Sequence, residues 1–225
     1  MSSSWITWIV VTALTGNPLI GLAVVVALAW AGEGWFRGRM WTPNRWYQRW
    51  ERIRRLRTDI AVNPHDATAK GQLGGLLMDR SPAEARTLLE EVHGRYPDMA
   101  VVAFHLGAAR LNVGDGDGGR SAMEHALSLK KDVGYGEPMI RLGRFEAARG
   151  RYAEAITCFE RALQVHTSSA EAMYELGMAR KGAGDREGAL RAWQDTIDLG
   201  KGAPDFKARQ DRPWRIRAWV RSRLP

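Results

Sequence analysis

A 34-residue repeat in the second half of the chain constrains the fold more than any other feature. Residues 136–169 and residues 170–203 carry identical or similar residues at corresponding positions: Leu142 and Leu176, Gly143 and Gly177, Gly150 and Gly184, Ala155 and Ala189, and Phe159 and Trp193. A fixed period of this length is typical of a helical-repeat solenoid. One helix pair cannot bury its apolar face, so further copies are expected to stack on these two.

The residues of this unit resemble the tetratricopeptide repeat (TPR) family. That family has Leu-Gly in a first helix, a turn glycine, and small and aromatic residues in a second helix. The resemblance implies that Gly143 and Ala155 lie where the two helices of a unit cross. It also implies that Phe159 fills the gap against the neighbouring unit.

Four such repeats are predicted, at residues 67–99, 100–135, 136–169 and 170–203. The first contains Leu73-Gly74 and a turn at residues 79–82, and the second contains Leu106-Gly107 and the segment GDGDGG at 114–119. That segment lacks the closing Glu of an EF-hand loop and the Gly-Lys-Ser/Thr of a P-loop. It falls where the repeat requires a turn, so we interpret it as a helix–helix turn.

An uncharged apolar segment occupies residues 5–31. It exceeds the roughly 20 residues that a helix needs to cross a bilayer, and tryptophans stand at both ends, where indole rings favour the headgroup layer. We predict a transmembrane anchor over residues 1–36. Gly16-Asn17-Pro18 interrupts it, which leaves open one kinked span, an interfacial helix with a shorter span, or a shallow hairpin. Cleavage as a signal peptide after the small-x-small segment at 29–31 is the rival reading.

Basic residues are concentrated at the two ends of the chain. The net charge is +8, yet residues 1–57 hold eight arginines and two acids, and residues 201–225 hold eight basic and two acidic residues. The middle of the chain is therefore mildly acidic, at −4. The positive-inside rule places the side that follows the apolar segment in the cytoplasm.

A basic amphipathic helix is expected within residues 37–66, starting at Thr42-Pro43 and ending near Val62. Its apolar stripe consists of Trp46, Trp50, Ile53, either Leu56 or Arg57, and Ile60. The stripe can lie on anionic headgroups or pack on the first repeat, and the two are compatible. The arginines expected at the membrane surface are Arg37, Arg39, Arg45, Arg49 and Arg52.

The C-terminal tail, residues 204–225, carries Trp214, Ile216, Trp219 and Val220 among seven basic residues. A solenoid needs a terminal helix over the open face of its last repeat, and we predict this capping role. Lipid headgroup contact is an addition to it. Nucleic acid is disfavoured as a partner, because the acidic repeats interrupt any positive track.

No catalytic motif or metal cluster is apparent. The five histidines, at 65, 93, 105, 125 and 166, are dispersed without a ligand-type spacing. The one cysteine, Cys158, excludes an intrachain disulfide and is expected to be a buried apolar residue. We expect no enzyme activity and no cofactor.

The TPR resemblance implies a groove, lined by the first helices, that receives a partner segment. The residues of this chain that correspond to the groove positions of the family are Met78, Asp79, Phe104, Leu111, Asn112, Arg144, Glu171, Tyr174, Met178 and Lys181. The carboxylate clamp of some TPR proteins needs Lys, Asn and Arg, whereas the matching positions here are Gly71, Gly75, His105, Glu137 and Arg141. Only the arginine fits, which disfavours that ligand mode. A groove without a ligand remains an alternative.

The expected fold is all-α: an N-terminal transmembrane helix, a TPR-type solenoid of about four helix pairs and a C-terminal capping helix. The expected function is a scaffold or adaptor in a bacterial-type inner membrane, single-pass, with the repeats in the cytoplasm. It would hold a protein partner near the membrane, in assembly of a membrane complex or as a subunit of it. The alternative is an exported periplasmic TPR protein that acts in envelope maintenance.

Overall fold

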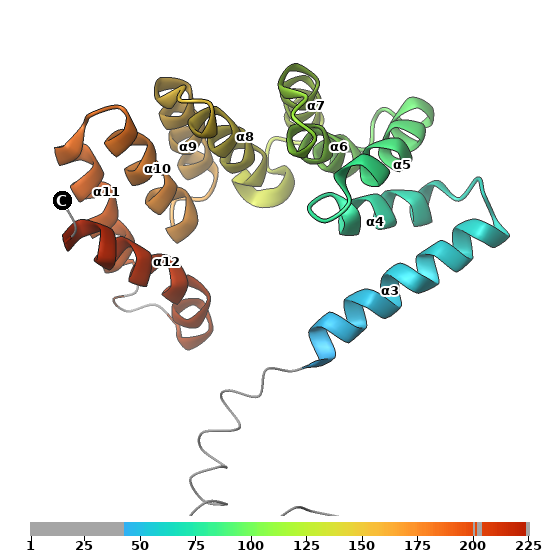
Figure 1. Cartoon of the computed structure of the whole chain (residues 1–225), viewed down its shortest axis with the longest axis horizontal. Helices are drawn as coiled ribbons and strands as arrows, with labels where there is room; N and C mark the ends of the chain where they lie inside the picture. The colour runs from blue at the N-terminus through green and yellow to red at the C-terminus, as the bar shows by residue number, and fades with distance from the viewer. Residues whose placement is uncertain (1–42, 200, 202–203, 224–225) are drawn as a thin grey trace, which may run out of the picture. The chain divides into compact units, whose positions relative to one another are not determined.

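The computed structural model describes residues 43–199, 201 and 204–223, and all regular secondary structure within them is helical (Figure 1). The chain divides into two compact units between Glu51 and Arg52. The predicted all-α repeat fold is confirmed for the described residues. The apolar segment at 5–31, with Arg37 and Arg39, lies outside them.

The repeats form four consecutive helix pairs, each of which falls within one predicted 33- to 36-residue unit. The pairs are α4 (Ala67–Leu77) with α5 (Pro82–Arg95), α6 (Ala100–Asn112) with α7 (Gly116–Leu129), α8 (Glu137–Ala148) with α9 (Tyr152–Val165), and α10 (Ala170–Gly182) with α11 (Arg186–Asp198). α3 (Pro43–Val62) precedes them and α12 (Asp205–Arg223) follows them. A short 3-10 turn, η1 (Val133–Gly136), leads into α8.

In each pair a glycine of the first helix lies under a large side chain of the second helix. A Cβ on Gly143 would come within 2.7 Å of the Phe159 ring, and a Cβ on Gly177 would collide with Trp193. The same relationship joins Gly74 with Leu89 and Gly107 with Met123. Phe159 therefore closes the crossing inside its own repeat, rather than only a gap against the neighbouring unit as expected, because the missing side chain opens that space.

The segment at 114–119 is shorter as a turn than the sequence suggested. α7 already begins at Gly116, because the Asp115 carboxylate caps it by accepting a hydrogen bond from the Gly118 N–H at 2.9 Å. Gly114, at φ 88°, makes the turn itself. The Asp185 carboxylate caps α11 in the same way, by accepting a hydrogen bond from the Gly188 N–H. Both second helices therefore begin with an aspartate N-cap.

The second half of α3 packs on the first repeat. Leu56 is buried in the cluster that contains Leu73 and Leu89, with Ile53 and Ile60 partly buried beside it. Arg57 is exposed instead and pairs with Glu84 at 3.0 Å. The apolar stripe therefore runs through Leu56. Trp46 and Trp50 precede the boundary between the two units and are 60% and 46% exposed.

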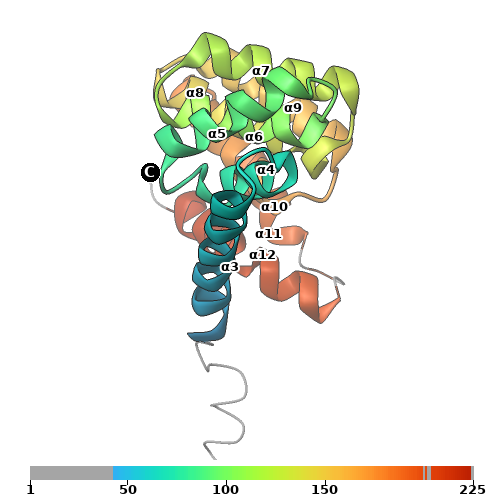
Figure 2. The same cartoon turned by 90° about the vertical axis from the view of Figure 1, so that its right-hand side faces the viewer.

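α12 packs against α11 and α10, at the C-terminal end of the repeats (Figures 1 and 2). Ala218 is fully buried at this contact. The Arg215 Nε donates to the Ile197 carbonyl at 3.1 Å, and the Lys207 ammonium donates to the Ser168 carbonyl at 3.0 Å. The predicted capping position is thus occupied, although Trp219 stays half exposed.

None of the helices in the described part of the chain combines the length and the apolar character that a membrane crossing requires. The segment on which the transmembrane prediction rests is not among them.

Candidate functional site

The first helices α4, α6, α8 and α10 pack against one another in sequence and form what we call the first-helix face. Between α6 and α8 this face contains a hollow of about 270 Å³. Its lining residues are Ala108, Leu111, Asn112, Arg141, Arg144 and Phe145. Three polar side chains thus surround an apolar floor, a combination that ligand-binding pockets share.

Arg141, in the third repeat, forms ion pairs with the first repeat and with its own helix at one edge of the hollow. Its guanidinium donates to Asp79 at 2.8 Å and to Glu137 at 2.9 Å. Burial lowers the pKa of Arg141, but Asp79 and Glu137 outweigh it and hold that pKa above its ordinary value. Asn112 donates to the Met78 carbonyl at 2.8 Å. Met78 and Asp79, two predicted groove positions, therefore anchor the polar rim from α4's C-terminal end.

Arg144 is fixed from the other side by α10. Its Nε and Nη2 donate to Glu175 at 2.9 and 2.8 Å, and Nη2 lies 2.7 Å from Glu171. Burial lowers the pKa of Arg144, but the two carboxylates raise it above its ordinary value. Burial raises the pKa of Glu171, partly offset by Arg144. Among the described residues, the Arg144 Nη1 makes no hydrogen bond, so this guanidinium is oriented and still has donors to offer.

Of the remaining predicted groove residues, Leu111 lines the hollow and the others do not. Phe104 and Leu111 are 6% and 7% exposed, so most of their surface packs in the core. Tyr174 is 8% exposed, because the Trp214 ring of α12 lies 5.6 Å from its own ring. Met178 and Trp214 both pack against the hydrophobic cluster that contains Tyr174. Lys181 lines a separate hollow between α11 and α12.

Three lining residues, Ala108, Arg141 and Phe145, were not among the predicted groove positions, and of these only Arg141 was named, as a clamp position. Phe145 is covered on one side by Arg149, whose guanidinium lies 4.1 Å from the ring centroid. The ring also fills the space above Gly116. Phe145 lies two positions after Gly143, the landmark of the repeat, and this spacing is the sequence signal that could have indicated it.

The side chains at the clamp positions do not form the set of Lys, Asn and Arg that a carboxylate clamp needs. The His105 imidazole lies where a side chain on Gly75 would be, with its Cε1 within 2.5 Å of an added Cβ. Burial, and then the charge of Arg141, lower the pKa of His105. The site therefore has one clamp cation, Arg141, and that cation is already bound by carboxylates.

Of the arginines predicted at the membrane surface, Arg45, Arg49 and Arg52 belong to the described residues. Arg52 donates to Gln72 of α4 at 3.3 Å and is exposed. Arg49 is half-buried on α3, and Arg45 belongs to the first turn of that helix. Nothing in these positions tests lipid contact.

Within the described residues no group of three or more potential metal ligands is found. Cys158 is buried, as expected, and burial raises the pKa of its thiol.

Comparison with known families bears on the two clearest repeats. A family model described as tetratricopeptide repeat matches residues 137–179, and a second model of the same description matches residues 171–199. Residues 137–199 therefore belong to the tetratricopeptide repeat family. The two matches cover α8 to α11, where the glycine crossings, the turn glycines and the caps are all present. No sequence among curated proteins matches this TPR protein significantly.

Solved structures support the TPR fold over a longer stretch. A MamA protein is similar at a TM-score of 0.58 and 21% identity, covering 66% of this chain and 81% of its own. TTC0263 of Thermus thermophilus, described as a thermophilic TPR protein, gives 0.58 and 16%, covering 75% and 89%. YrrB, described as a TPR protein with an unusual peptide-binding site, gives 0.54 and 17%, covering 76% and 86%. At these identities the likeness concerns the fold.

Proposed function

We propose that this TPR protein is a membrane-anchored scaffold whose first-helix face holds an extended segment of a protein partner. The observation that carries the proposal is the hollow at Asn112, Arg141 and Arg144. TPR proteins bind protein partners, and the peptide-binding site named for YrrB supports a peptide as the kind of ligand.

The chemistry of the hollow favours a segment that presents carbonyl or carboxylate oxygens beside one apolar side chain. Arg144 is held by Glu171 and Glu175, so little rotamer entropy is lost when its remaining N–H groups donate to a ligand. The floor of Ala108, Leu111 and Phe145 accepts the apolar side chain. No catalytic role is part of the proposal.

Affinity capture from detergent-solubilised membranes tests the binding function. The wild-type chain and Arg144→Ala are compared, with Arg86→Ala as matched control, since Arg86 is an exposed arginine of α5 outside the hollow. We expect a partner that is recovered with the wild type and the control but lost with Arg144→Ala. Equal recovery with all three would contradict the assignment of the hollow.

The location is the second part of the proposal. The uncharged segment at 5–31 and the arginines that follow it support a bacterial-type inner membrane anchor with the repeats in the cytoplasm. Alkaline phosphatase fused after Pro225 is expected to be inactive. An active fusion would instead favour the second candidate, an exported TPR protein that acts in envelope maintenance.

A further inference from the structure

A second open surface lies between α11 and α12. Two hollows, of about 350 and 540 Å³, adjoin there and share Leu190, Ser222 and Arg223. We call their union the end trough. Its other lining residues are Lys181, Arg186, Ala189, Arg191, Trp193, Gln194, Ile197, Trp219 and Arg221. Along α11 it extends from Arg186 to Ile197, about three helical turns.

The packing of the repeats indicates what shape fits this trough. Each first helix after α4 is packed by two second helices: α6 by α5 and α7, α8 by α7 and α9, and α10 by α9 and α11. α12 continues the series, because it packs against α11 and α10 as α10 packs against α9 and α8. Among the described helices, however, α11 is the only second helix on α12. The trough is therefore the position of one further helix.

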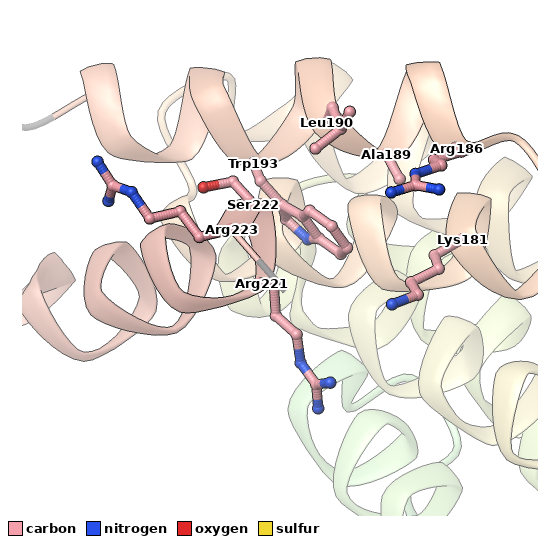
Figure 3. A pocket seen from close by; sticks show the side chains of 8 residues that line it. All are labelled: Lys181, Arg186, Ala189, Leu190, Trp193, Arg221, Ser222 and Arg223. Carbon is pink, nitrogen blue, oxygen red and sulfur yellow. The ribbon is translucent and has the colours of Figure 1, made fainter. Parts of the chain in front are cut away.

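The trough exposes two large apolar side chains, while the Trp193 ring at its base is 2% exposed. Leu190 is 39% exposed and Trp219 is 50% exposed. In Figure 3 the Trp193 ring stands between α11 and α12, below Leu190. Leu and Trp side chains spaced along the trough are what the apolar stripe of an amphipathic helix would cover.

The rim of the trough is basic. Five of its described lining residues are Lys or Arg and none is acidic: Lys181, Arg186, Arg191, Arg221 and Arg223. Figure 3 shows Lys181 and Arg186 on one side of the Trp193 ring and Arg223 on the other. Arg223 also lies 4.0 Å above the Trp219 ring. A helix that carries acids beside its apolar stripe would meet cations along both flanks.

We propose that the end trough binds one amphipathic α-helix of a protein partner, with an apolar stripe flanked by acidic residues. The charge argues against a helix of this chain as occupant, since α3 holds six basic residues and two acids. This interaction surface is separate from the hollow on the first-helix face and does not depend on it.

A designed peptide tests the proposal on the full chain in detergent micelles. The probe is a fluorescein-labelled helix of about 18 residues with Leu at i, i+4, i+7 and i+11 and Glu on both flanks. Binding is followed by fluorescence anisotropy. We expect saturable binding, which Leu190→Asp and Trp219→Ala each weaken by at least about tenfold. Leu129→Asp on α7 is the matched control, because Leu129 is 38% exposed and lies outside the trough, and it should leave binding unchanged.

Further arms separate the rival occupants. The same peptide with Lys in place of Glu should not bind, and equal binding would overturn the charge argument. Bimane attached at Leu190→Cys should change its emission with the Glu peptide in nanodiscs. A change caused by phosphatidylglycerol alone would overturn the proposal in favour of lipid. A dimer in sedimentation that Leu190→Asp dissociates would overturn it in favour of a second copy.

Discussion

The ring of Phe159 occupies the space that a side chain on Gly143 would need, with its Cε1 2.7 Å from the position of an added Cβ. Both residues are buried, and the ring is 1% exposed. The crossing of α8 and α9 therefore tolerates no larger residue at this glycine without movement of the helices.

Gly143→Ala is accordingly expected to lower the free energy of unfolding by about 1–3 kcal/mol, the usual cost of overpacking. Gly94→Ala is the control, since a Cβ at this position of α5 meets nothing within 4 Å. It should stabilise the chain slightly, by about 0.4–1 kcal/mol. Denaturant unfolding measures both. Equal midpoints for the two variants would show that the crossing is not as close as described.

A second prediction concerns Glu146, a carboxylate that is 1% exposed and paired with both Arg120 and Arg151. Its removal breaks two charge-assisted hydrogen bonds. The arginines are about two-fifths exposed and can turn to solvent, so Glu146→Ala should cost about 1.5–3 kcal/mol. Glu154→Ala, an exposed position of α9, should change the unfolding midpoint little. A loss of similar size in both variants would contradict the ion-pair account.

Much of this architecture could be predicted from the sequence, because the determinants are local and periodic. The start of α3 at Pro43 follows from the fixed φ of proline, and the turn at Gly184 from its left-handed φ of 88°. The glycine crossings recur every 33 to 36 residues, so one recognised copy locates the others.

The candidate site could be predicted only in part. The repeat register indicates that Asn112 and Arg144 lie on the first helices, but nothing periodic links Asp79 with Arg141, which are 62 residues apart. The covering of Tyr174 by Trp214 depends on how α12 docks, and no repeat pattern encodes that. In the glycine-rich segment at the start of α7, every residue favours a turn, so the sequence did not identify Asp115 as the residue that caps the helix.

The third prediction is a pH dependence that arises from His105. Burial, with the charge of Arg141, lowers its pKa below the ordinary 6.5, while Asp79 opposes. The unfolded chain then binds the proton more tightly than the folded chain. The stability is fully present above pH 6.5, the unfolded-state pKa, and is lost as the pH falls from there through the lower pKa of the folded state. His93 shifts in the same direction, also through burial.

Thermal unfolding of the wild type and His105→Gln between about pH 7.5 and about pH 5 measures this effect. The raised pKa of Glu171 acts in the opposite sense, so the informative quantity is the difference between the two slopes. His105→Gln should lose less stability on acidification than the wild type. His65→Gln, at an exposed position, should follow the wild type. Parallel curves for all three chains would rule out His105 as the source.

The fourth prediction concerns the docking of α12. Ala218 is fully buried against α11 and α10, so Ala218→Glu places a carboxylate in an apolar contact and should release α12. Hydrogen exchange should then accelerate in α12 and around Tyr174 and Trp193, which it covers. The amides of α4 to α7 should keep their protection, because α12 packs against α10 and α11, at the other end of the repeat array. Acceleration throughout the chain would instead indicate global unfolding.

The Asp79–Arg141 ion pair has a consequence for cooperativity. This ion pair joins two repeats that are not adjacent in the chain, the first and the third. An array held by nearest-neighbour contacts alone frays freely from its ends, whereas this pair ties the terminal repeat to the centre. A partner carboxylate that captures Arg141 releases Asp79, so ligand binding and end fraying become thermodynamically linked. The first repeat should exchange faster when the hollow is filled, the reverse of ordinary ligand protection.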